Sequence, residues 1–155
     1  MNRSFREIAT KVELRFKRLM AQKPVKLERL PRNMPKRGVY LLSQGSHHLY
    51  VGRSNRLRQR LQEHGRASAD HYSASFAFLI ARHHTGHKSA TYKPKGSRAS
   101  LSRSRRFKRA FASARKRVAK MDIRWVCEPH QTRQALLELY AATALRTRYN
   151  RFHTY

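Results

Sequence analysis

Two stretches of the chain decide the fold: Gly38-Val39-Tyr40-Leu41-Leu42-Ser43 and His47-His48-Leu49-Tyr50-Val51-Gly52. Both are short and rich in aliphatic and aromatic residues, and the polar turn Gln44-Gly45-Ser46 separates them, which predicts a β-hairpin. Alternation along the strands places Tyr40 on the face opposite Val39 and Leu41. Gly52 has no Cβ, so we expect another backbone or a ligand to come close there.

Hydrophobic periodicity predicts the elements around this hairpin. Helices are expected at 4–21, capped by Ser4, at 56–64, at 102–120, and from Thr132 to about 147; a third strand is expected at 121–128. Residues 75–83 fit a helix or the start of a strand, and the helix is favoured. Residues 25–37 are expected to form a linker and residues 84–101 a mobile loop. The fold class is therefore α/β in the broad sense (α+β), with a small three-stranded antiparallel sheet flanked by helices and an extra N-terminal helix.

The charge of the chain is extreme, because 36 lysines and arginines face 8 acidic residues among 155 residues, for a net charge of +28. Such a balance favours a polyanionic partner, first nucleic acid and second an anionic membrane. The longest apolar runs, such as Phe76–Ala81, are too short to span a bilayer, and no signal peptide is expected. The single cysteine, Cys127, is expected to be a buried strand residue in a reducing compartment, which predicts a cytoplasmic protein.

The middle of the chain contains basic residues and no acidic ones, since no acidic residue occurs between Asp70 and Asp122. A surface this one-sided repels itself unless a partner compensates the charge, which favours contact with a nucleic-acid backbone over a merely solvated face. The residues predicted to bind nucleic acid are Arg53, Arg56, Lys93, Lys95, Arg103 and Arg105.

The hairpin motifs Gly38-Val39-Tyr40 and Tyr50-Val51-Gly52, followed by Arg60, His64, a helical Glu138 and a terminal Asn150, resemble the signature of the GIY-YIG nucleases. The matching segments span about residues 37–152, and the turn of the hairpin is at the short end for that family. By this resemblance, residues 1–36 form an N-terminal helix and linker, and residues 37–155 form a nuclease domain with a basic loop-helix insertion at about 84–120.

The resemblance implies an endonuclease that hydrolyses DNA phosphodiester bonds, in double-stranded or branched DNA, with Mg²⁺ or Mn²⁺ as its cofactor. Glu138 would hold the metal, Arg60 would grip the scissile phosphate, and Asn150 would brace the site. Tyr40 would activate the attacking water and Tyr50 would position it, although the roles of the two phenols can be exchanged. A tyrosine base needs a nearby cation, because an unperturbed phenol titrates near pH 10.

Each of these roles has a simpler alternative. Glu138 would point to solvent from an amphipathic helix, Arg60 would pair with Glu63, and the tyrosines would only pack in the sheet. His64 would relay a proton, contact phosphate, or be an exposed histidine on the outer face of its helix. The chain as a whole would be a non-catalytic DNA- or RNA-binding protein that keeps the fold, or a ribosome-associated basic protein. Zinc is not expected, because the histidine pairs have no matching ligand spacing elsewhere.

Overall fold

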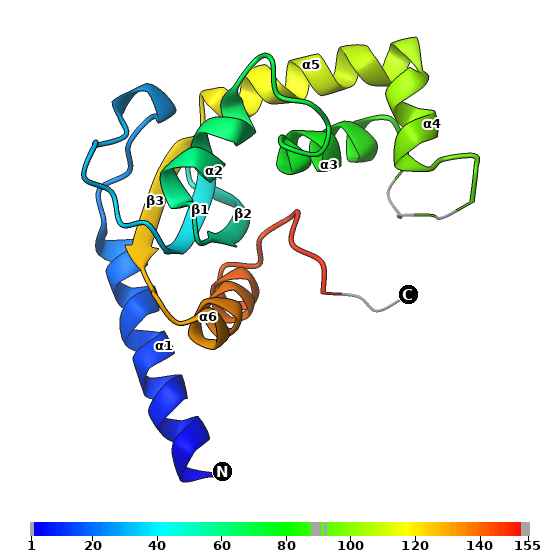
Figure 1. Ribbon diagram of the computed structural model, residues 1–155. Coiled ribbons are helices and arrows are strands. Elements are labelled where there is room, and N and C mark those ends of the chain that lie inside the picture. Colours follow the sequence, from blue (N-terminus) through cyan, green and yellow to red (C-terminus); the bar gives the residue numbers. More distant parts are fainter. Residues whose placement is uncertain (1, 88–90, 92, 153–155) are drawn as a thin grey trace. The chain divides into compact units, whose positions relative to one another are not determined.

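The computed structural model describes residues 2–87, 91 and 93–152 of the chain (Figure 1). Its sheet has three antiparallel strands in the order β2-β1-β3, namely β1 (Gly38–Gln44), β2 (His47–Ser54) and β3 (Asp122–Cys127). The hairpin β1–β2 and the third strand lie where the sequence pattern predicts them. Together with the helices, this sheet confirms the predicted α+β class.

The chain divides into two compact units. The first comprises the described residues of Met1–Arg60 and Met121–Tyr155 and contains the sheet. The second, Leu61–Lys120, is helical and includes the basic insertion expected from the sequence. Helix α2 (Leu57–Gly65) begins in the first unit and ends in the second.

The core of the first unit lies between the sheet and two helices, α1 (Arg3–Ala21) and α6 (Gln131–Ala144). Figure 1 shows both helices on the same side of the strands. The buried cluster that joins them consists of Val12, Leu19, Val39, Leu41, Val51, Val126, Leu137, Ala141 and Ala142. The alternation of β1 therefore leaves Tyr40 on the face of the sheet opposite to these helices.

Both helix starts differ from the sequence prediction. Helix α1 is capped by Asn2, whose side chain accepts hydrogen bonds from the N–H groups of Ser4 and Phe5, so Ser4 is not the cap. Helix α6 begins at Gln131, and the N-cap residue His130 makes no side-chain capping bond, so the predicted cap at Thr132 is wrong. Both helices still form, because burial of one apolar face contributes more than a cap.

The buried face of α6 includes a polar residue. Gln134 and Leu137 are buried, whereas Leu139 is 44% exposed. Gln134 tolerates burial because its side-chain amide donates to the carbonyl of Glu128, at 2.7 Å, and to Asn55. A buried polar group with hydrogen-bond partners escapes most of its desolvation cost, and hydrophobicity alone does not reveal it.

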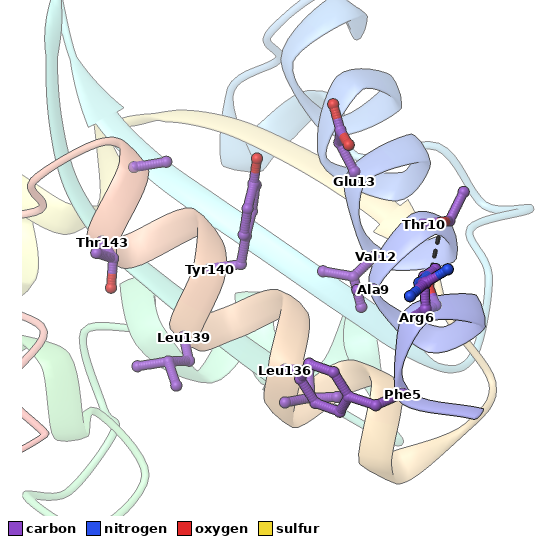
Figure 2. Close-up of a pocket in the computed structure, with 11 residues that line it drawn as sticks. Phe5, Arg6, Ala9, Thr10, Val12, Glu13, Leu136, Leu139, Tyr140 and Thr143 are labelled. Carbon is purple, nitrogen blue, oxygen red and sulfur yellow. Dashed lines mark hydrogen bonds between the residues drawn. The ribbon is translucent and has the colours of Figure 1, made fainter. Parts of the chain in front are cut away.

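An open groove of about 730 Å³ runs between α1 and α6 (Figure 2). Its walls are mostly apolar, with Phe5 and Ala9 on α1 and Leu136 and Tyr140 on α6. Phe5 is 48% exposed. The first turns of α1 are therefore covered on one side only.

The second unit is built around aromatic contacts between α3 (Ser75–His84) and α5 (Arg105–Ala119). The ring of Phe78 lies 4.9 Å from that of Phe107 and 6.2 Å from that of Phe111, measured between centroids. The Arg98 guanidinium stacks over Phe78 at 4.2 Å, an arrangement favoured by the ring quadrupole. The helix favoured for residues 75–83 is confirmed.

Two predictions for this unit need correction. The single helix expected at 102–120 is two helices, α4 (Arg98–Arg103) and α5, because Ser104 adopts an extended conformation and caps α5 through the N–H of Phe107. The loop expected at 84–101 is likewise shortened by the start of α4. The part of that prediction that falls on 88–90 and 92 lies outside the described residues.

Smaller differences concern the linker and the cysteine. The linker at 25–37 contains a 3₁₀ turn, Leu27–Arg29, and Val25 forms an isolated bridge with Ile123. Cys127 is exposed rather than buried, because it is the last residue of β3 and lies beyond the core. Among the residues described, no helix is long and apolar enough to cross a membrane.

Candidate active site

Two tyrosines lie side by side on the face of the sheet opposite α1 and α6. In the antiparallel register Tyr40 pairs with Gly52 and Leu42 pairs with Tyr50, so all four residues share one face. The rings of Tyr40 and Tyr50 are 6.3 Å apart with an interplanar angle of 49°. Tyr40 is only 1% exposed. The hairpin therefore holds the two phenols as neighbours.

Gly52 is required by the position of the Tyr40 ring. A Cβ added to Gly52 would lie 2.3 Å from the phenol oxygen of Tyr40 and 2.4 Å from its Cζ. Contacts this short do not occur between real atoms, so any other residue at this position would displace the phenol. The sequence predicted that another backbone or a ligand approaches Gly52, whereas the approaching group is the side chain of Tyr40.

Arg60, on α2, is hydrogen-bonded to the Tyr40 phenol. Burial, followed by the neighbouring Tyr50, raises the pKa of Tyr40 far above its ordinary value, and the Arg60 guanidinium opposes that rise. Burial also raises the pKa of Tyr50. Both side chains are consequently neutral phenols at physiological pH. The Arg60 guanidinium is the cation that would stabilise a phenolate at Tyr40.

Glu138 lies on α6 and pairs with Arg53 of β2. The Arg53 Nε donates to Glu138 Oε2 at 2.9 Å, and the side chain of Glu138 is 19% exposed. Burial raises the pKa of Glu138, although the Arg53 hydrogen bond and charge offset part of that rise. Within the described part of the chain, Oε1 of Glu138 makes no hydrogen bond or ion pair. The carboxylate is thus only half-partnered.

The position of Glu138 links α6 to the tyrosines around the edge of the sheet. At 100° per residue, Glu138 and Leu136 lie on opposite flanks of α6, and Leu136 faces the groove beside α1. Glu138 therefore faces away from α1, where it pairs with edge strand β2. Its charge raises the pKa of both Tyr40 and Tyr50, so the carboxylate is near both phenols although α6 covers the other face of the sheet.

Asn150 closes the free edge of β2. Its side-chain amide donates to the Val51 carbonyl at 2.8 Å, and its side-chain oxygen accepts from the Val51 N–H at 2.8 Å and from the Thr147 hydroxyl at 2.8 Å. The N–H of Tyr149 also donates to the carbonyl of Leu49. These bonds mimic a further strand and fix the backbone on both sides of Tyr50.

The described residues offer few metal-binding groups at this site. The described residues contain no group of three or more histidines, cysteines or carboxylates placed to hold a metal ion. A single half-partnered carboxylate such as Glu138 fits Mg²⁺, which keeps most of its water and is commonly held by one or two carboxylates together with substrate phosphates. It does not fit zinc, which needs three or four protein ligands.

The remaining predicted site residues are His64 and the basic side chains. His64 is 1% exposed and packs edge-on against Phe76, at 6.3 Å, so the prediction of an exposed histidine on the outer face of α2 is wrong. Arg56 is exposed near the start of α2. The remaining predicted nucleic-acid contacts belong to the second unit and are exposed: Lys93, Lys95, Arg103 and Arg105.

Sequence reasoning missed the partner of Glu138. Arg53 was predicted as a contact to nucleic acid, and its ion pair with Glu138 was not expected. A signal was present, because Arg53 follows Val51 by two residues and so lies on the face that α6 covers.

Comparison of the chain with known protein families, with curated proteins and with solved structures gave no match.

Proposed function

We propose that the chain is a divalent-metal-dependent endonuclease that hydrolyses DNA phosphodiester bonds, of the kind that its hairpin motifs resemble. The observation that supports this proposal best is the convergence of Tyr40 on β1, Arg60 on α2 and Glu138 on α6. These are a phenol, a guanidinium and a carboxylate from three separate elements. Phosphodiester hydrolysis requires an activated water, stabilisation of the charge that grows on the phosphate, and stabilisation of the leaving oxygen, and groups of these three kinds can supply those functions.

In this proposal Arg60 binds the scissile phosphate. A guanidinium offers paired N–H donors that match two phosphate oxygens, and it stabilises the charge that grows on them as water adds. Arg60 is already fixed by its bond to Tyr40, so it brings the phosphate next to the phenol. The Arg60 side chain therefore loses little further conformational entropy when the phosphate binds.

Tyr40 orients the attacking water, and Tyr50 holds the second side of the same pocket. The raised pKa of Tyr40 means that its phenol is neutral in the free protein, so it becomes a base only when added positive charge lowers that pKa. Arg60 supplies part of that charge. The oxygen of water adds to phosphorus, one P–O ester bond breaks, one water proton leaves through Tyr40, and one proton goes to the departing oxygen.

Glu138 would hold the cation through Oε1, the oxygen that Arg53 does not use. When bound, a Mg²⁺ or Mn²⁺ ion neutralises charge on the phosphate and stabilises the leaving oxygen. Arg53 orients the carboxylate, and Asn150 keeps β2 in place beneath Tyr50.

The proposal is tested with supercoiled plasmid, single-stranded and branched DNA, each incubated with Mg²⁺ and with a chelator. Nicking that needs Mg²⁺ and falls about 10²-fold or more in Tyr40→Phe supports it. Binding to all three DNAs without cleavage in Mg²⁺ or Mn²⁺ contradicts it. The control is Leu14→Ala, a substitution of an exposed residue of α1, which should cleave as the wild type does.

A second candidate is a non-catalytic nucleic-acid-binding protein that keeps the fold. The specific observation in its favour is the ion pair between Arg53 and Glu138, which occupies one oxygen of the carboxylate proposed to hold the metal. The same plasmid experiment separates the two candidates, because this one predicts tight binding and no metal-dependent turnover.

A further inference from the structure

The second unit contains a basic hollow of about 530 Å³ that the proposed chemistry does not use. It lies between the end of α3 and the first half of α5, and its lining residues are His84, Thr85, Arg105, Arg106, Arg109, Ala110 and Ser113. Among the described residues, no carboxylate lines it. A hollow of this size falls in the range of small-ligand sites and has room for a phosphodiester with its adjoining sugars.

The three arginines of this hollow differ from others in the same unit. Arg98 donates to the carbonyl of His71 and stacks on Phe78, and Arg115 donates to the carbonyl of Ala69 at 2.5 Å. Those guanidinium groups hold the unit together. In the part of the chain that the structure describes, by contrast, Arg105, Arg106 and Arg109 form no ion pair or side-chain hydrogen bond.

Their spacing concentrates the charge on one face of α5. Arg105 and Arg109 are four residues apart and therefore adjacent on the helix surface, and Arg106 lies beside them. Like charges at this spacing destabilise a helix, and no acidic residue of the unit lies in the sequence after Asp70 to offset them. An anion bound between these side chains would remove the repulsion.

We propose that this hollow, called the α5 arginine pocket, binds a backbone phosphate of the nucleic acid. Three guanidinium groups provide paired N–H donors whose geometry matches phosphate oxygens. The exposed hydroxyl of Ser113 adds a neutral donor at the rim. Contacts from guanidinium groups to phosphate position the backbone and do not read sequence. This inference rests on the proposed nucleic-acid substrate but not on hydrolysis.

The position of the pocket predicts which basic residues contribute most to binding, whereas the charge of the segment does not distinguish among them. The sequence pattern predicts contacts from Lys93, Lys95, Arg103 and Arg105 alike, whereas only Arg105 of these lines the pocket. Binding should therefore depend on Arg106 and Arg109, which the sequence did not single out, more than on lysines of equal charge outside the pocket.

The test compares two triple variants of the full chain that remove the same charge. The pocket variant removes the three arginines that line the pocket: Arg105→Gln/Arg106→Gln/Arg109→Gln. The control variant removes three exposed cations of the same unit that do not line it: Arg66→Gln/Lys108→Gln/Lys116→Gln. Binding to a fluorescent DNA duplex is measured in chelator at several salt concentrations, so that cleavage cannot contribute.

The expected result is a loss of affinity of about tenfold or more for the pocket variant, with the slope of log Kd against log salt reduced by about 1, the value for one lost phosphate contact. The control variant should lose less than about threefold, since scattered surface charges act only through the general field. Equal losses in both variants would overturn the proposal and leave only non-specific attraction. Circular dichroism of both variants checks that α5 remains folded.

Two further arms separate this inference from the proposed function. Arg109→Lys keeps the charge but loses the fork of donors, so it should weaken duplex binding several-fold; affinity equal to that of the wild type would argue against a built phosphate site. Leu14→Ala, the control variant on α1, should bind the duplex as the wild type does, and because binding is measured in chelator the result does not depend on whether the chain proves to be a nuclease. Tighter binding of the pocket to anionic lipid vesicles than to DNA would overturn the choice of nucleic acid.

Discussion

Two carboxylates of the first unit, Glu128 and Glu138, are both shielded from water, but they differ in how many of their oxygens have a partner. Glu128 follows β3, and its side chain is 1% exposed. Its Oε1 accepts from Arg133 and from the N–H of His130, both at 3.0 Å, and its Oε2 lies 3.5 Å from Arg15. Both of its oxygens are used. Glu138 has one partner, Arg53, on one oxygen.

The pKa of each group reflects this difference. Burial alone would raise the pKa of Glu128, but the hydrogen bonds from Arg133 and His130 and the charges of Arg133 and Arg15 lower it. At Glu138 burial prevails over Arg53, and the pKa is raised. A saturated carboxylate holds structure, here by joining α1 to the start of α6. An unsaturated one costs stability and remains available to a ligand.

The largest effect expected from this comparison is on cleavage. Glu138→Gln removes the charge that would hold the cation, so Mg²⁺-dependent nicking of plasmid should fall by about 10³-fold. Affinity for DNA in chelator should stay within about twofold of the wild type. Glu13→Gln, at an exposed acid of α1, is the control. If cleavage and affinity fall together, Glu138 has a structural role like that of Glu128.

The next effect is on stability. Glu128→Gln leaves Arg15 and Arg133 without their shared anion, and breaking a buried ion pair from one side costs about 3 kcal/mol. The Tm should fall by about 6 °C or more, as measured by differential scanning calorimetry. Below that Tm, cleavage per folded molecule should equal that of the wild type. An unchanged Tm would mean that the cluster around Glu128 contributes nothing to folding.

The pH dependence of stability should have opposite signs at the two sites. The lowered pKa of Glu128 gives stability that is present above about pH 4.3, the ordinary value, and is lost as the pH falls through the folded-state pKa. The raised pKa of Glu138 gives stability that is full below about pH 4.3 and is lost as the pH rises. At pH 7, Glu138→Gln should therefore raise the Tm by about 1–2 °C. A lower Tm at pH 7 would reverse the comparison.

The smallest effect concerns Arg53. Because Arg53 lowers the pKa of Glu138, Arg53→Gln should raise that pKa further and move the acid limb of the cleavage rate to higher pH. At pH 6 the rate should fall about twofold to fivefold, as expected from a partly exposed ion pair worth 0.2–1 kcal/mol. Arg56→Gln removes an equal charge nearby and should leave the pH profile in place. A parallel loss at every pH would assign Arg53 to DNA contact instead.

The hairpin was predictable from sequence because its signals are local. A period of two and a short turn specify β1 and β2. The existence of the third strand also followed from pattern, whereas its place beside β1 and the packing of Tyr40 on Gly52 did not. The family-like residues Tyr40, Arg60 and Glu138 were named from the sequence, and the structure brings them near one another.

The features that could not be predicted depend on contacts between residues far apart in the sequence. Gln134 is buried because Asn55 and a carbonyl of Glu128 receive its amide, and no helical pattern contains that information. His64 is buried because Phe76, twelve residues later, packs against it. The brace from Asn150 to Val51 joins residues 99 apart in the chain. Such long-range hydrogen bonds override local propensity.

The most direct test of the account is the binding of Mn²⁺ to the folded chain, followed by electron paramagnetic resonance in the presence of a phosphorothioate duplex that resists cleavage. The account predicts one Mn²⁺ bound per chain in the wild type and in Glu13→Gln, and none at the same concentration in Glu138→Gln. Retention of the bound Mn²⁺ in Glu138→Gln would contradict the claim that the half-partnered carboxylate is the metal ligand.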